Sequence, residues 1–197
     1  LPVDVRQLSL LGAGWTAGVL GALAAGDATS ATLYETTGRR GVIELDDGSP
    51  QPDQFVSAPG QVFPLYHVLA DASDWKQLGG NICNVEFSHP KSITGFAVAF
   101  DGNGLKAVAA NVTAEKVTVH VLGLLPDSVA VVRMLDSTTA SVAVMQPEAF
   151  RSAFRDSDGI VNGVRVAKEY TVPADGVLKV ELAPYALATI TTANAVV

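Results

Sequence analysis

The chain has 197 residues, of which 48% are hydrophobic and 17% are charged. This composition excludes a disordered chain, and the length allows a core that needs no disulfides. The 20 acidic residues outnumber the 13 basic ones and give a formal charge of −7. That balance argues against a nucleic-acid partner, because such affinity comes from basic side chains that contact phosphates. Three histidines and the single Cys83 offer little for a zinc site, so we expect no metal and no cofactor.

One uncharged stretch of 19 residues, Leu8 to Gly26, approaches the length that spans a bilayer. Its five glycines lower its helix propensity, and Asp27 follows at once. A signal peptide would need a basic start, whereas here Asp4 offsets Arg6. We therefore expect buried structure in a cytoplasmic protein without a membrane partner.

Residues 1–80 are predicted to alternate strands and helices. A buried strand is expected from Val5 to Leu11, then a glycine turn at residues 12–14, a helix from Ala13 to Ala25 and a second strand from Ser30 to Thr36. The helix glycines would allow close approach to a sheet, and a helix between parallel strands forms a right-handed crossover unit. A long irregular segment, residues 37–63, precedes a helix that starts at Pro64. Irregular segments of this length are usually functional.

Residues 81–197 show almost only strand patterns, in which apolar and polar residues alternate between turn sequences. These strands predict an antiparallel β-sandwich domain. The expected strands are 84–88, 93–100, 105–112, 116–122, 129–135, 140–145, 164–170, 177–182 and 186–192, with turns at 102–104, 126–128, 158–159 and 175–176.

The two parallel strands expected in residues 1–80 leave both sheet edges without partners inside the chain. Open edges and a bare apolar sheet face are costly, and two strands rarely stand alone. We therefore expect further strands from upstream sequence or from another chain. The chain would then be the C-terminal portion of a longer assembly, inactive by itself. The alternative is that residues 1–80 pack on the sandwich as an α/β extension.

Residues 12–17, Gly-Ala-Gly-Trp-Thr-Ala, match the dinucleotide-binding pattern G-x-G-x-x-G/A, and Glu35 follows at the distance of a ribose-binding acid. A dinucleotide-binding α/β enzyme is therefore one open interpretation. Its weakness is the all-β second half, because the fold needs further strand–helix units. The alternative is a glycine turn that lets the helix and the strand pack closely.

The densest polar cluster, residues 35–41, follows the second expected strand. Its carboxylate, hydroxyl and guanidinium groups are suited to bind a polyol or a carboxylate and to activate water. The alternative is a turn closed by a surface ion pair. Trp15 and Trp75 are either sugar-stacking platforms or core residues, and His67 is expected to be structural.

The chain resembles the D-apionate lactonase family, which is related to glycoside hydrolases and acts in the catabolism of the branched sugar apiose. The resemblance is specific over residues 5–71. It is carried by Arg6-Gln7-Leu8-Ser9-Leu10, Gly12-Ala13-Gly14-Trp15-Thr16, Glu35-Thr36-Thr37-Gly38, Arg40-Gly41-Val42, Gly48-Ser49-Pro50, Phe55, Ser57, Pro59-Gly60 and the run from Val62 to Asp71. Arg39 stands where the family pattern has a tryptophan.

This resemblance implies the last two βα units of a (β/α)8 TIM barrel over residues 1–80, followed by a β-sandwich over residues 81–197. The expected seventh strand ends without an acid, at Ser9-Leu10-Leu11-Gly12, which disfavours a two-carboxylate glycosidase mechanism. Hydrolysis of a sugar lactone needs only one base and donors for the oxyanion. We assign Glu35 as the catalytic base. The substrate-binding candidates are Thr36, Thr37, Arg40, Trp15 and Ser9.

Two further functions remain open beside a lactonase that acts on a small sugar lactone or carbohydrate. One is a glycoside hydrolase of the same architecture. The other is a non-catalytic, carbohydrate-associated β-sandwich module, which would turn over no lactone and would place its site away from Glu35.

Overall fold

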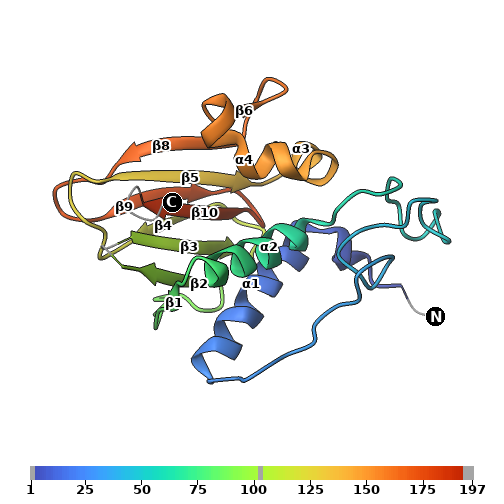
Figure 1. Cartoon of the computed structure of the whole chain (residues 1–197), viewed down its shortest axis with the longest axis horizontal. Coiled ribbons are helices and arrows are strands. Elements are labelled where there is room, and N and C mark those ends of the chain that lie inside the picture. The colour runs from blue at the N-terminus through green and yellow to red at the C-terminus, as the bar shows by residue number, and fades with distance from the viewer. Residues whose placement is uncertain (1–2, 102–103, 193–197) are drawn as a thin grey trace.

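The computed structural model describes residues 3–101 and 104–192, in which helices cover one face of a six-stranded antiparallel sheet (Figure 1). Within these ranges no helix is long and apolar enough to cross a membrane. A 3-10 helix at Val5–Leu8 precedes the named elements. These are α1 (Leu10–Ala25), α2 (Pro64–Gln77), β1 (Asn81–Ile82), β2 (Ile93–Phe100), β3 (Gly104–Asn111), β4 (Val117–Val121), β5 (Val129–Leu135), α3 (Ala140–Met145), α4 (Pro147–Ser157), β6 (Ile160–Val161), β7 (Val164–Arg165), β8 (Ala167–Thr171), β9 (Leu178–Leu182) and β10 (Leu187–Thr192).

Six strands form the larger sheet, in the order β1-β2-β3-β10-β5-β8, β4 pairs with β9 in a smaller one, and the short β6 pairs with β7. All pairs among the named strands are antiparallel, as the sequence predicts for this half. The two sheets share a buried cluster that includes Val132 of β5 and Ile190 of β10, together with Leu178, Val180 and Leu182 of β9. The apolar alternation along β9 is therefore explained by burial against the larger sheet.

Helices α1 and α2 belong to a second buried cluster with β2 and β3, on the other face of the larger sheet (Figure 1). Glycines allow α1 to approach the sheet closely. A Cβ atom on Gly21 would lie 2.2 Å from the carbonyl oxygen of Gly95, and one on Gly18 would lie 2.5 Å from Thr94 Oγ1. This confirms the predicted role of the helix glycines. Residues from both halves of the chain thus share one core.

The predicted strand from Val5 to Leu11 is wrong, and so is the glycine turn after it. Residues 5–8 form a 3-10 helix, and α1 already begins at Leu10. Capping explains this start, because Ser9 Oγ accepts a hydrogen bond from the Gly12 amide at 3.0 Å. Residues 12–17 therefore lie inside a helix. The dinucleotide interpretation loses the strand-to-helix loop that it requires.

The second predicted parallel strand, residues 30–36, is wrong as well. The segment after α1 is extended and runs back beside that helix (Figure 1). Tyr34 Oη and Thr16 Oγ1 are 2.7 Å apart and join the two. In the described ranges no strand pairs with residues 28–35, so the predicted parallel βα units do not form in this chain. A strand forms only where a partner satisfies its backbone groups.

Three further predictions differ from the structure. Residues 140–145 form α3 rather than a strand, because a turn at Asp136 leads into it and α4 continues from it after Gln146. Residues 84–88 form no strand, and α4 was not predicted. The expected turn at 102–104 lies mostly outside the described residues. The irregular segment 37–63 and the helix from Pro64 are confirmed.

Candidate functional site

The turn after the extended segment brings Glu35 and Arg40 together. The Glu35 amide donates to the Arg40 carbonyl at 3.0 Å, and the Val42 amide donates to the Thr36 carbonyl at 3.1 Å. Gly38 adopts a φ of +74°, which side chains disfavour, and its amide donates to the carbonyl of Ile43. The Glu35 carboxylate consequently lies 2.6 Å from the Arg40 guanidinium.

The Glu35–Arg40 pair is exposed, with side-chain exposures of 56% and 65%. Thr36 and Thr37 are exposed on the same turn. The structure thus places four of the six predicted site residues on one turn. This geometry agrees with a surface ion pair that closes the turn, and it also agrees with a carboxylate that water can reach. An exposed ion pair of this kind adds only about 0–1 kcal/mol of stability.

The other two predicted site residues, Ser9 and Trp15, lie on the segment that leads into and forms α1. Ser9 is occupied as the helix cap, where its hydroxyl also donates to the Arg6 carbonyl at 2.7 Å. Trp15 is 63% exposed, an unusual position for so large an apolar side chain. Trp75 is instead a core residue, 3% exposed, that packs on Phe96.

A buried carboxylate that the sequence analysis did not single out orders the long segment behind this turn. Glu44 is 1% exposed, accepts a hydrogen bond from the Leu45 amide at 2.8 Å and accepts another from the Ser57 hydroxyl. The Gln7 side chain also donates to the Gly41 carbonyl at 2.6 Å and ties the start of the chain to the same turn. Hydrogen bonds made by Glu44 and Gln7 therefore hold in place the chain next to the Glu35 turn.

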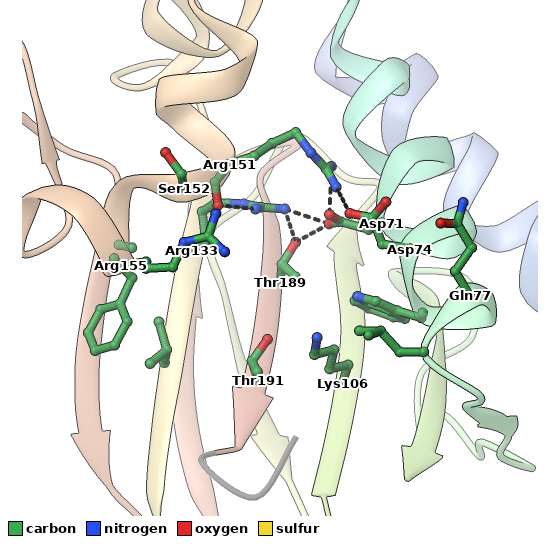
Figure 2. A pocket seen from close by; sticks show the side chains of 15 residues that line it. Asp71, Asp74, Gln77, Lys106, Arg133, Arg151, Ser152, Arg155, Thr189 and Thr191 are labelled. Atoms are coloured by element: carbon green, nitrogen blue, oxygen red, sulfur yellow. Dashed lines mark hydrogen bonds and ion pairs between the residues drawn. The ribbon is translucent and has the colours of Figure 1, made fainter. Parts of the chain in front are cut away.

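A cleft of about 560 Å³ lies on the helix-covered face of the larger sheet, between α2 and α4 (Figure 2). At its upper end Asp71 of α2 forms ion pairs with two arginines. Arg133 of β5 lies 2.6 Å from one carboxylate oxygen, and Arg151 of α4 lies 2.7 Å from the other. Thr189 of β10 donates to Asp71 at 3.1 Å, and Arg151 also reaches Asp74 at 2.5 Å.

Burial alone would raise the pKa of Asp71. Attraction by Arg133 and Arg151, with the hydrogen bond from Arg133, outweighs burial, so the pKa lies below its usual value and the carboxylate is charged. Burial, followed by repulsion from Arg133, lowers the pKa of the neighbouring His67 to about 3. The neutral ring lies 3.0 Å from the Ala143 carbonyl through Nε2 and packs on Phe150, as expected for a structural histidine.

Asp71 ends the run from Val62 that carries the family resemblance, but the sequence analysis assigned it no role. The available signal was a charged residue four positions before Trp75, on a helix face that is otherwise buried. Its partners are 62 and 80 residues away, so no local pattern identifies them. Among the described residues no group of three or more His, Cys, Asp or Glu side chains is placed to hold a metal ion.

Comparison with known proteins supports the resemblance read from the sequence. Residues 2–77 match the family model described as D-apionate lactonase, TIM barrel domain. No curated protein sequence matches the chain. The resemblance to that family is therefore confirmed over the first part of the chain, and the model names the domain type that the resemblance implied.

Solved structures with a similar fold include several glycoside hydrolases. A GH30 endoxylanase from Clostridium papyrosolvens C71 matches with a TM-score of 0.59 and 12% identity, over 97% of this chain and 40% of its own. A conserved exported protein from Bacteroides fragilis gives 0.56 and 15%, over 97% and 35%. A monomeric β-xylosidase from Caulobacter crescentus CB15 gives 0.53 and 14%, over 98% and 43%. The chain thus has the fold of the matched part of these proteins and spans less than half of their length.

Proposed function

We propose that the chain is the C-terminal portion of a barrel-plus-sandwich hydrolase that opens sugar lactones of the apionolactone type. The match of residues 2–77 to the D-apionate lactonase barrel domain carries this proposal. The fold shared with glycoside hydrolases agrees with a carbohydrate substrate. The predicted cytoplasmic location and the absence of membrane and nucleic-acid partners stay predictions.

The Glu35 turn is the proposed centre of the reaction. The exposed Glu35 carboxylate accepts a proton from water while the water attacks the lactone carbonyl carbon. The ring C–O bond then breaks as Glu35 passes that proton to the ring oxygen, which leaves as a hydroxyl, and the new carboxylic acid releases its own proton to solvent. Arg40, 2.6 Å from Glu35, orients the base and holds the carboxylate product, and the hydroxyls of Thr36 and Thr37 contact the substrate.

Trp15 is the further proposed substrate contact, and Ser9 has a supporting role. The exposed indole of Trp15 offers a flat apolar face on which a sugar ring packs. Ser9 caps α1, and we therefore assign its effect to the placement of that helix rather than to chemistry on the substrate.

The partner proposed for this site is the remainder of the barrel, supplied by upstream sequence or by another chain. Residues 28–35 form neither helix nor strand, and no strand in the described ranges pairs with them. Ala31, Thr32 and Leu33 are exposed or half-exposed in this apolar segment. Parallel strands on both sides would satisfy its backbone and bury these side chains.

Turnover by the native protein tests the proposal directly. We expect release of acid, followed with a pH indicator, from a branched five-carbon sugar lactone, and no release of nitrophenol from aryl xyloside or arabinoside. A glycoside hydrolase would give the opposite result. A non-catalytic carbohydrate module would give no turnover of either substrate, and either outcome would reject the lactonase proposal.

A further inference from the structure

The lower part of the cleft between α2 and α4 is basic, although the chain as a whole is acidic. Among the residues that the structure describes, four basic and two acidic side chains line the cleft. Both acids, Asp71 and Asp74, are engaged by Arg133 and Arg151 at the upper end. Below them, Figure 2 shows Lys106 of β3 and Thr191 of β10 side by side. These two residues are direct cross-strand partners.

Lys106 is a half-buried cation that lies over an aromatic ring. Its ammonium nitrogen lies 5.5 Å from the centre of the Phe100 ring. Within the described ranges no carboxylate lies within ion-pair distance of it. Burial lowers the pKa of Lys106, partly offset by the carboxylates above it. A half-buried cation with no described carboxylate in ion-pair contact favours an anionic ligand.

The rest of the cleft combines hydroxyl and amide groups with apolar side chains. Thr191, Ser152 and Gln77 line it with polar groups. Leu78 and Phe154 line it as exposed apolar groups, 44% and 38% exposed. This combination suits a small molecule that has hydroxyl groups, an apolar C–H face and a negative charge.

We propose that this cleft binds a small polyhydroxy carboxylate, that is, a sugar acid in its open form. The carboxylate lies on Lys106 and Thr191. The hydroxyl groups contact Gln77, and the carbon chain lies against Leu78. The residues differ from those of the Glu35 turn, and the inference does not depend on lactone hydrolysis.

The test is an amide NMR titration of the chain with three probes at constant ionic strength. D-gluconate carries both the charge and the hydroxyls, D-glucitol carries only the hydroxyls, and acetate carries only the charge. We expect saturable shifts of β3 and β10 amides near Lys106 with gluconate. Affinity for glucitol and for acetate is expected to be at least about tenfold weaker.

Two lysine variants decide whether the charge at this position matters. Lys106→Met is expected to weaken gluconate binding at least about tenfold. Lys168→Met is the matched control, because Lys168 also lies over an aromatic ring, 5.0 Å from the centre of Tyr170. Its neighbour Ala167 lines the cleft, so alternation places Lys168 on the opposite face of β8. The control is expected to bind gluconate as the unchanged chain does.

Four results would overturn the inference. They are the absence of saturable gluconate shifts, equal affinity for acetate, equal weakening by Lys168→Met, and unchanged binding by a folded Lys106→Met chain. Binding is expected to persist in Glu35→Gln. A failure of the lactonase proposal and a failure of this inference are therefore distinguishable.

Discussion

Replacing Glu35 with glutamine is expected to lower kcat for lactone hydrolysis by the native protein at least about 100-fold. Glutamine keeps the size of the side chain and can still accept a hydrogen bond from Arg40, but it cannot accept a proton from water. KM is expected to change little, because the substrate contacts assigned to Arg40 and the threonines remain. Steady-state kinetics with the branched sugar lactone measure both constants.

Glu181→Gln is the matched control for this variant. Glu181 forms an ion pair with Lys116 at 2.8 Å, and its side chain is 66% exposed, comparable to Glu35. Loss of either exposed pair costs at most about 1 kcal/mol of stability, so neither variant should unfold the protein. Turnover by Glu35→Gln that matches turnover by Glu181→Gln would remove Glu35 from the mechanism.

Replacing Asp71 with asparagine is expected to lower the free energy of unfolding by about 3–5 kcal/mol. The Asp71 side chain is 5% exposed and neutralises Arg133 and Arg151, whose side chains are 13% and 16% exposed. The variant leaves two largely buried guanidinium groups without a counter-charge, and one amide oxygen replaces only part of their hydrogen bonding. Urea unfolding at neutral pH measures the loss.

Asp74→Asn provides the comparison within the same cluster. Asp74 lies 2.5 Å from the same Arg151, but its side chain is 58% exposed, so water replaces much of the lost interaction. We expect a cost below about 1 kcal/mol for this variant. Equal losses for Asp71→Asn and Asp74→Asn would contradict the assignment of Asp71 as the buried centre of the cluster.

Features that depend on local pattern were predicted well from the sequence. The alternation of Leu178, Val180 and Leu182 identifies a strand with one buried face, and Pro64 marks the start of α2. The glycines of α1 were correctly interpreted as points of close approach to the sheet. In each case the residues that decide the structure are neighbours in sequence.

Features that depend on distant partners were predicted poorly. Residues 30–34 have the composition of a buried parallel strand but form none here, because strand formation needs partners that the described chain does not supply. The sequence ASVAVM at residues 140–145 fits a helix as well as a strand over so short a length, and the turn at Asp136 decides it.

The candidate site shows the same division. Residues 35–41 were predicted as a cluster because they are contiguous, and the turn brings Glu35 to Arg40. The basic cleft was missed, because Asp71, Arg133 and Lys106 come from three separate elements. A single buried acid in a helix predicts a basic partner but does not identify it.

The central claim is that strands from outside this chain complete the extended segment and form the site around Glu35. Amide hydrogen exchange of residues 31–34 in the native protein, purified whole, tests it most directly. The account predicts that these amides exchange at least about 1,000-fold more slowly than those of an unstructured peptide, as expected for a core strand. Exchange as fast as in an unstructured peptide would contradict it.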